Sequence, residues 1–333
     1  MIQFLQQEFG IFPGQSFKIR QYDAYYDGHH IYILIKVYEQ EQEELQVRYE
    51  MTNYLRQNGE KFVPAFFAAT DGRFVKQLDE NYYIVLKLEQ WRNKRYQFPG
   101  RRLAYFHNHG KYFRSEKDVL NRLGKWKELW ESRIDRLEKI WQQNVMNQPN
   151  NDFERLFIDS FPYYAGMTEN AIQYFVDTTI DEQPAGFDVA TVCHERFTMD
   201  TWTDPIILKD PFDWIVDHPV RDIAEWIRHV YFSQPQMVQK PIQKFIQDYE
   251  TQTSLSPFAW RLLYSRLVLP IHYFQCIELY YARLADNFDN SMTGEIKKIL
   301  NQSGDYERFL AHFYDMAGAP HRSLQLPKLD WFN

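Results

Sequence analysis

The sequence predicts an α+β protein of two lobes, a small strand-rich lobe over residues 1–89 and a large helical lobe over residues 90–333. Two observations carry this prediction. The first ninety or so residues contain short runs of β-branched and aromatic residues, separated by turn pairs, around one helical segment. From about residue 100 onward, apolar residues recur at steps of three and four, as they do along amphipathic helices. A chain of 333 residues, 44% of them hydrophobic, can bury the core of two such lobes.

The small lobe is predicted to be an antiparallel sheet with one helix. Strands are indicated over residues 17–37, where an aromatic run at 17–26 and the run IYILIKV at 31–37 flank the turn pair Asp27-Gly28. Residues 41–58 change to a helical composition that ends at Gly59. Three further strands are predicted at 62–69, 73–77 and 82–88.

The large lobe is predicted to open with a long amphipathic helix. Ser115 and the following residues resemble a capping box. Seven apolar residues follow at helical spacing, a pattern typical of core packing: Leu120, Leu123, Trp126, Trp130, Ile134, Leu137 and Trp141. Residues 184–217 interrupt the helical pattern with short apolar runs among charged turns. Further helices are predicted at 222–232, at 240–249, and from Ser256 toward residue 284 with a kink at Pro270.

Composition limits the class of protein. A net charge of −7 is unlike the basic face of a dedicated nucleic-acid binder. The two cysteines, Cys193 and Cys276, imply no disulfide framework and favour a reducing compartment. The first residues resemble no signal peptide, and no run of apolar residues is long enough to span a membrane. We therefore expect a protein that is made in the cytoplasm and binds neither nucleic acid nor membrane.

Three segments carry a specific order of motifs. Residues 191–202, TVCHERFTMDTW, resemble the loop written H-G-D-x-x-x-x-N in aminoglycoside phosphotransferases and choline-kinase-like enzymes. Residues 206–224, IILKDPFDWIVDHPVRDIA, resemble their metal-binding aspartate and the Asp-Leu-Ala that follows. Residues 100–107, GRRLAYFH, resemble their Leu-Ala-x-x-His helix. Within this superfamily the chain resembles the spore-coat CotS/YutH group of endospore-forming bacteria over nearly its whole length. The resemblance implies a two-lobed, protein-kinase-like fold of the aminoglycoside phosphotransferase type.

The resemblance also implies that the catalytic loop, within residues 191–224, is degenerate. His194 keeps the histidine of the loop, but Arg196 stands at the position of the catalytic aspartate, which accepts the proton of the attacking hydroxyl. Arginine cannot accept a proton. Thr201 stands where an asparagine ligates the second Mg²⁺, and a neutral hydroxyl beside a fixed cation is a poor site for a divalent ion. No intact catalytic residue is therefore expected.

Two aspartates of the motif are retained. Asp210 matches the metal-binding aspartate, as a vestige of the metal site, although an alternative register would put Asp213 there. The spacing of twelve residues to Asp222 favours Asp210. By resemblance, Asp222 has the structural role of bracing the catalytic loop.

The nucleotide-binding part is expected to be vestigial. By resemblance, Lys36 matches the lysine that holds the α- and β-phosphates, with Glu50 as its helix partner and Glu44 as an alternative. A lysine that ends a strand and simply reaches solvent is the plainer interpretation of Lys36. The first hairpin, IRQYDAYY at 19–26, lacks the glycines that let backbone amides close over phosphates. Tight ATP binding is therefore not expected.

Three other features have less specific interpretations. Cys193 and His194 are neighbours in an extended segment, so their side chains point to opposite faces and cannot form a catalytic dyad. His107 and His109 could hold a metal, but no set of ligands at suitable spacing accompanies them, and a helix-end pair is favoured. One basic and aromatic stretch is either a solvated loop or a docking site for an acidic or phosphorylated partner: Trp91, Arg92, Lys94, Arg95, Tyr96, Phe98, Arg101 and Arg102.

These features predict a kinase-like protein without phosphotransferase activity that takes part in the structure or assembly of the spore coat. The spore assignment rests on the resemblance alone. It implies other coat proteins as partners and no required cofactor, with weak binding of ATP and Mg²⁺ still possible. One alternative is a divergent kinase that transfers phosphate from ATP to a small molecule or a protein, with Glu195 or Asp200 replacing the missing base. Another is a sensor that binds ATP without turnover.

Overall fold

The computed structural model describes residues 1–89, 98–202, 206–283, 291–329 and 331. The chain divides into two compact units, each built from segments that are distant in sequence. The predicted small lobe lies in the first unit, together with the segments that resemble the catalytic loop. The first unit comprises Met1–Arg122, Val189–Ser233 and Lys244–Ser254, and the second comprises Leu123–Asp188, Gln234–Gln243 and Leu255–Asn333.

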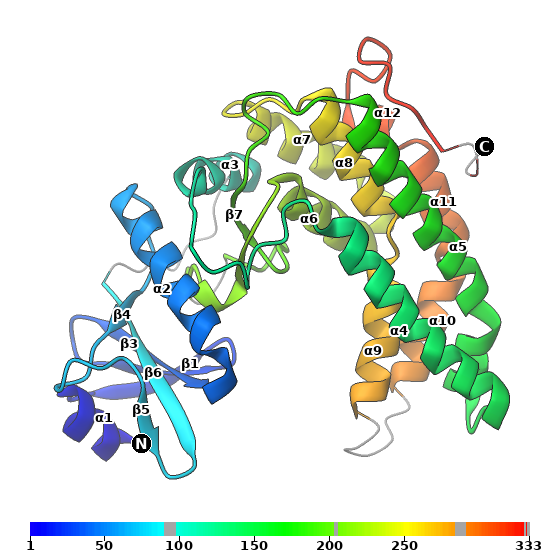
Figure 1. Ribbon diagram of the computed structural model, residues 1–333. Coiled ribbons are helices and arrows are strands. Elements are labelled where there is room, and N and C mark those ends of the chain that lie inside the picture. Colours follow the sequence, from blue (N-terminus) through cyan, green and yellow to red (C-terminus); the bar gives the residue numbers. More distant parts are fainter. Residues whose placement is uncertain (90–97, 203–205, 284–290, 330, 332–333) are drawn as a thin grey trace. The chain divides into compact units, whose positions relative to one another are not determined.

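The small lobe is an antiparallel sheet in the order β1-β2-β3-β6-β4, with β5 paired to β6 (Figure 1). Helix α2 (Gln42–Gln57) follows β3, where the sequence predicts a helix. The predicted sheet and its helix are confirmed, but the prediction of a single helix is wrong, because α1 (Ile2–Phe9) precedes the sheet. The strands are β1 (Gln15–Ile19), β2 (Tyr22–Tyr26), β3 (Ile31–Val37), β4 (Ala65–Phe67), β5 (Lys76–Leu78) and β6 (Asn81–Leu88).

The sheet buries both of its faces, because each face packs against its own apolar cluster. Ile33 and Ile35 of β3 lie in a cluster that includes Leu208, two residues before Asp210. Leu34 lies in the other cluster, which includes Leu5 of α1. Since side chains alternate along a strand, successive residues of β3 face different clusters. This alternation determines which face of the sheet Lys36, near the end of β3, can occupy.

A two-residue turn joins β1 to β2. Ile19 pairs with Tyr22, so Arg20 and Gln21 alone make the turn. Arg20 has a φ of 55°, in the left-handed region that glycine favours. The turn contains no glycine, as the sequence indicates for this hairpin.

The rest of the first unit places a helix and a small second sheet around the loop. Helix α3 (Pro99–Gly110) lies against β7 (Thr191–His194), which pairs with β8 (Trp214–Asp217), and α6 (Val220–Ser233) follows. The close approach of α3 requires Gly110, because a Cβ there would lie only 2.8 Å from Thr191 Oγ1. The helix that carries His107 is thereby held beside the strand that carries His194.

The second unit is helical. Its long helix α4 (Trp126–Asn147) begins later than predicted, because the Ser115 hydroxyl accepts a bond from the Lys117 amide within a turn and caps no helix. The helix predicted to kink at Pro270 is interrupted there and forms two helices, α8 and α9. The Ser256 cap is confirmed, since its hydroxyl accepts from the Ala259 amide. The other helices are α5 (Asp152–Asp181), α8 (Pro257–Val268), α9 (Ile271–Arg283), α10 (Ser291–Asn301), α11 (Ser303–Ala311) and α12 (Phe313–Ala317).

Four further elements complete the description: α7 (Gln239–Glu250) and the short 3₁₀ turns η1 (Glu39–Glu41), η2 (Pro211–Asp213) and η3 (Pro235–Met237). Among the described residues, no helix combines the length and the apolar character needed to cross a bilayer.

Candidate functional site

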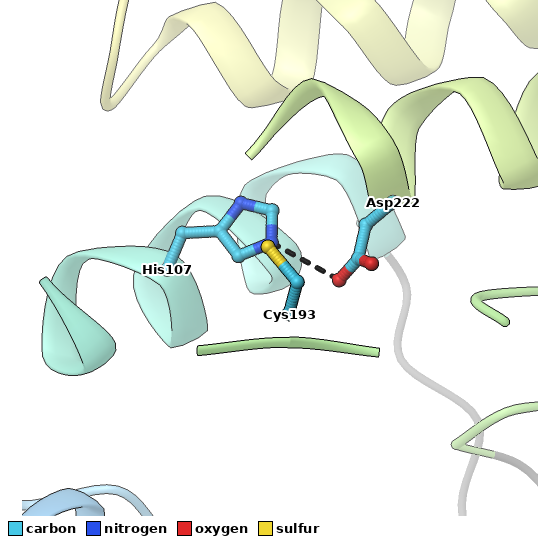
Figure 2. A group of neighbouring side chains, drawn as sticks. All are labelled: His107, Cys193 and Asp222. Atoms are coloured by element: carbon cyan, nitrogen blue, oxygen red, sulfur yellow. Dashed lines mark hydrogen bonds and ion pairs between the residues drawn. The ribbon is translucent and has the colours of Figure 1, made fainter. Parts of the chain in front are cut away.

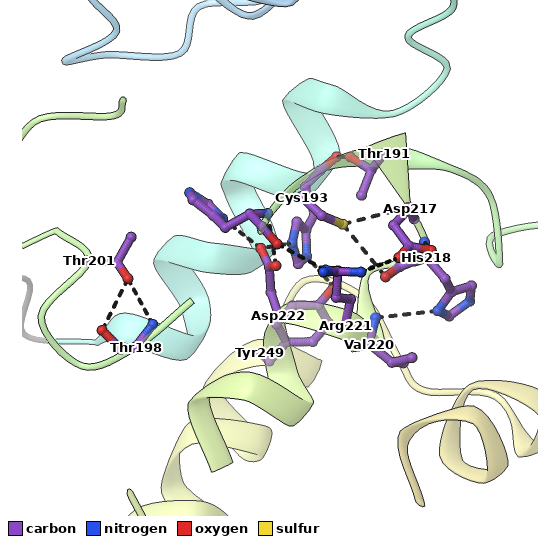
Figure 3. A network of polar contacts seen from close by, with 12 residues as sticks. Thr191, Cys193, Thr198, Thr201, Asp217, His218, Val220, Arg221, Asp222 and Tyr249 are labelled. Atoms are coloured by element: carbon purple, nitrogen blue, oxygen red, sulfur yellow. Dashed lines mark hydrogen bonds and ion pairs between the residues drawn. The ribbon is translucent and has the colours of Figure 1, made fainter. Parts of the chain in front are cut away.

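Asp222, near the start of α6, is fully buried and holds the loop that carries His194 (Figure 3). Its Oδ1 accepts the backbone N–H of His194 at 2.9 Å. Its Oδ2 lies 2.7 Å from His194 Nδ1 and 3.1 Å from His107 Nε2. The structure therefore places Asp222 where the bracing role implied by the resemblance requires it, and joins three segments through one carboxylate.

The protons of this cluster can be assigned from its geometry. An ionised carboxylate only accepts hydrogen bonds, so both histidine nitrogens that face Asp222 donate. The other nitrogen of His107 then accepts from the Tyr249 hydroxyl, 2.9 Å away. Burial alone would raise the pKa of Asp222, but the two histidines hold it well below its usual range. Burial lowers the pKa of His107, which keeps that imidazole neutral.

Arg221, whose role no motif in the sequence indicated, holds the same loop from its other side. Its Nε donates to the His194 carbonyl at 3.1 Å, and its Nη2 donates to the Glu195 carbonyl at 3.2 Å. Its Nη1 pairs with Asp217 at 3.1 Å. The available signal in the sequence was the position of Arg221 directly before Asp222. If Asp222 is buried to brace the loop, its neighbour can be buried too, and a buried arginine needs hydrogen-bond partners of its own.

His107, Cys193 and Asp222 together offer three ligand atoms that a metal could use (Figure 2). Hydrogen bonds already account for these atoms. The Asp222 carboxylate accepts from His107, and the Cys193 thiol lies 3.6 Å from the carbonyls of Asp217 and His218. His109 instead contacts Glu60 at 2.6 Å, so His107 and His109 do not converge on a common ligand position. Cys193 and His194 point to different partners, as their extended backbone predicts.

Asp210 lies at the start of η2 in a different environment. It is 2% exposed, and its Oδ1 accepts the Phe212 amide at 3.0 Å. The phenol of Tyr22 lies beside it. Burial, and then the nearby charge of Asp213, raise the pKa of Asp210 to about 6. Two carboxylates thus stand close together at the position that resembles a metal site.

The turn between β1 and β2 reaches this pair of carboxylates. Arg20 Nη1 donates to Asp213 Oδ2 at 2.9 Å, and its Nη2 donates to the carbonyl oxygen of Thr201. The Thr201 hydroxyl accepts from the Thr198 amide at 2.7 Å, within its own turn. The sequence alone gave no signal for these contacts, because Arg20 and Asp213 are separated by 193 positions.

Lys36 lies on the wrong face of the sheet for a phosphate-holding lysine. Its neighbour Ile35 belongs to the cluster that includes Leu208, whereas Lys36 pairs across the sheet with Tyr83 on the face toward α1. Its side chain is exposed, with Nζ 5.5 Å from the centre of the Tyr38 ring.

The predicted pair between Lys36 and Glu50 is therefore not formed. No carboxylate among the described residues makes an ion pair with Lys36. Glu50 accepts a bond from Gln46 at 3.0 Å, and the alternative partner Glu44 pairs with Arg48 at 3.0 Å. The plainer interpretation of Lys36, a strand-end lysine that reaches solvent, is the one that fits the structure.

A different buried lysine pairs with a glutamate in this unit. Lys209, just before Asp210, is fully buried and forms an ion pair with Glu60, which follows α2. Arg102 and His109 also contact the Glu60 carboxylate. Lys209 Nζ lies 5.0 Å from the centre of the Trp202 ring. A lysine inside the apolar run IILKD was the signal that sequence reasoning missed, since a buried cation requires a partner.

The remaining predicted positions lie on the loop surface. Arg196 is exposed, at the position that resembles the catalytic aspartate. Glu195 contacts Arg221 at 3.4 Å, and Asp200 lies 3.8 Å from His229. Most of the basic and aromatic stretch, residues 91–96, lies outside the described residues. Of its described members, Phe98 stacks with Arg101 at 5.1 Å, and Arg102 contacts Glu60.

Comparisons with known proteins identify the family of this chain. The family model "Spore coat putative kinase YutH" matches residues 2–313. The endospore coat-associated protein YutH of Bacillus subtilis (strain 168) is 34% identical over 328 residues, which cover 98% of this chain and 96% of that protein.

Solved structures support the fold. An aminoglycoside phosphotransferase from Alicyclobacillus acidocaldarius has a TM-score of 0.65 at 14% identity, covering 92% of this chain and 93% of that one. Amicoumacin kinase hAmiN has a TM-score of 0.60 at 12% identity, covering 90% and 91%. The predicted two-lobed, kinase-like fold of the aminoglycoside phosphotransferase type is confirmed. The family model covers most of the chain and the relative is similar along nearly all of it, so this protein belongs to the spore coat YutH family.

Proposed function

We propose that this chain is a kinase-like protein of the endospore coat that acts in coat structure or assembly without transferring phosphate. The observation that carries the proposal is the residue found at the position that resembles the proton acceptor. The position of the proton acceptor holds Arg196, an exposed cation that cannot act as a base. A positioned general base contributes about 10²–10⁴-fold to such reactions.

Neither of the nearby carboxylates is well placed to replace the missing base. Glu195 is turned toward Arg221, whose guanidinium also holds the backbone of the loop. Asp200 is exposed beside His229. A base must lie within hydrogen-bond reach of the proton that it removes, and both side chains are directed toward other partners.

The positions that resemble nucleotide and metal ligands support the same proposal. Lys36 faces α1, away from the cluster that contains Leu208. The Thr201 hydroxyl is buried and bonded within its own turn. We therefore propose that the protein needs no cofactor, and that any ATP binds weakly and without a requirement for Mg²⁺.

The place of action is proposed from the relative. The Bacillus subtilis relative is described as endospore coat-associated, and it is similar along nearly the whole of this chain. We propose the same location here, with other coat proteins as partners. A buried anchor such as the Asp222 carboxylate, which bonds the His194 backbone and ring, is suited to a stable scaffold.

A phosphotransfer assay tests the proposal. The purified chain, given MgATP and candidate hydroxyl acceptors, is expected to release or transfer no phosphate above background. Signal that persists through purification and is abolished by Asp210→Ala would contradict the proposal and favour a divergent kinase. Thermal melting with ATP separates the remaining case, since a ligand at 100 times its Kd adds about 2.7 kcal/mol to stability. A large shift at micromolar MgATP that EDTA removes would indicate a nucleotide sensor.

A further inference from the structure

The turn between β1 and β2 carries a long side chain where its backbone favours glycine. Arg20 has a φ of 55°, a conformation that glycine adopts at no steric cost and that residues with a Cβ rarely adopt. Two-residue hairpin turns accordingly favour glycine, asparagine or aspartate at such positions. An arginine in this conformation needs a stabilising contact outside the turn.

The structure supplies that contact on the segment that resembles the catalytic machinery. Arg20 bonds to the Asp213 carboxylate and to the Thr201 carbonyl oxygen, and its side chain is 26% exposed. Tyr22, on the next strand, places its phenol beside Asp210 and packs against the cluster that includes Leu208. The hairpin is therefore held by three charged or polar contacts and one apolar contact.

The oxygens that Arg20 contacts are the kind that divalent cations bind. Carboxylate and carbonyl oxygens are the protein ligands that Mg²⁺, Ca²⁺ and Mn²⁺ prefer. Asp210 adds a second carboxylate close to Asp213, and two such charges repel each other unless a cation stands near them. Here Arg20 of the chain itself supplies the positive charge.

We propose that the β1–β2 turn is a latch, in which Arg20 occupies the oxygens of Asp213 and Thr201 and excludes divalent cations from them. The inference rests on the proposed function, because it treats this loop as a site without turnover. Opening the latch frees both oxygens and the neighbouring Asp210. The guanidinium of Arg20 thus stands where an exchangeable divalent cation could otherwise bind.

Binding of Mn²⁺ to the full chain, followed by electron paramagnetic resonance, tests the latch. Arg20→Met is expected to tighten Mn²⁺ binding at least about tenfold over the wild type, because a competing cation is removed. The matched control is Lys18→Met, which also removes one positive charge from the hairpin. Lys18 pairs with Asp23 at 3.3 Å, and both side chains are more than half exposed. Its Mn²⁺ affinity should equal that of the wild type.

A second variant separates a latch from a residue that serves only the turn. Arg20→Gly suits the backbone of the turn, so it would resemble the wild type if the arginine had no role beyond the turn. The latch predicts that Arg20→Gly binds Mn²⁺ as tightly as Arg20→Met. Asp213→Asn breaks the same contact from its other end, and both Arg20→Met and Asp213→Asn should speed amide hydrogen exchange over residues 15–26.

Three results would overturn the latch: tight Mn²⁺ binding by the wild type, no gain in either Arg20 variant, or an equal gain in Lys18→Met. Each result is independent of the phosphotransfer assay. All Arg20 variants should still transfer no phosphate, because Arg196 remains in place. Transfer by the wild type would overturn the proposed function, while the latch would still be judged by Mn²⁺ binding.

Discussion

Asp210 and Asp222 are separated by twelve positions, and both are buried, yet their surroundings have opposite electrostatic effects. Asp222 accepts bonds from three N–H groups of His194 and His107, which hold its pKa well below the usual range despite burial. Asp210 accepts one backbone amide and the Tyr22 phenol and faces a second carboxylate, and burial together with that charge raises its pKa to about 6.

The comparison shows which part of the kinase-like motif this chain has kept. The carboxylate that holds the loop is surrounded by donors, and Arg221 holds the loop from the other side. The carboxylate that resembles a metal ligand accepts from one amide and one phenol, and the cation that lowers its pKa, Arg20, comes from the turn between β1 and β2. Residues of the motif itself thus hold its loop in place, whereas the carboxylates that resemble metal ligands depend on a cation from outside the motif.

The largest effect that would break the comparison is expected from Asp222→Ala. Removal of this side chain leaves three buried N–H groups unpaired, and each costs roughly 1–3 kcal/mol. We expect a loss of about 3–5 kcal/mol in the free energy of unfolding, measured as a lower midpoint in urea. The control is Arg196→Ala at an exposed position of the same loop, which should change stability by less than about 0.5 kcal/mol. Equal midpoints for the two variants would mean that Asp222 does not brace the loop.

An intermediate effect, of opposite sign, is expected from Asp210→Asn. The amide keeps an acceptor for the Phe212 amide but cannot ionise. The pKa of Asp210 is raised from 3.8 to about 6, so the folded protein binds the proton more tightly than the unfolded chain. The free energy of unfolding of the wild type therefore falls as pH rises between these two values. We expect Asp210→Asn to be about 3 kcal/mol more stable than the wild type at pH 8.

The pH dependence sharpens the comparison. The gain from Asp210→Asn should shrink to nothing as pH falls below the unfolded pKa of 3.8, where the wild-type carboxyl is protonated in both states. Asp222 has the opposite sign, because its pKa is lowered in the folded protein. Its stabilisation is complete above the unfolded pKa and is lost as pH falls, so the cost of Asp222→Ala should decrease in acid. Parallel pH profiles for the two variants would contradict the opposite shifts.

The smallest effect is expected from Lys36→Met. The side chain is exposed and touches only the Tyr38 ring among the described contacts, so stability should change by less than about 0.5 kcal/mol. Binding of ATP, measured by calorimetry, should also be unchanged, because Lys36 faces α1. The matched variant is Lys209→Met, which leaves the Glu60 carboxylate with one cation fewer in a buried site and should cost roughly 3–5 kcal/mol. A drop in ATP affinity for Lys36→Met would place this lysine at a nucleotide site after all.

Much of the fold could be predicted because local patterns report burial. The run IYILIKV matches β3, and α2 lies where the helical composition and Gly59 indicate. The same run explains the failure at Lys36. It is apolar on both faces, so its pattern cannot tell which face meets the loop and which meets α1. Helix α1 was missed, and its place on the sheet depends on packing that no local pattern records.

By itself, the sequence determined the order of the motifs and the spacing of His194, Asp210 and Asp222, and its resemblance to phosphotransferases predicts that Arg196 stands at the position of a base. The order and the spacing need only residue identities, whereas the role of each position comes from the resemblance. The tertiary structure alone decided which cation lies on which carboxylate: Arg20 on Asp213, and Lys209 on Glu60. These partners are 193 and 149 positions apart. The energy of an ion pair depends on the distance between its charges and on their exposure to water, and both quantities arise only when distant segments pack together.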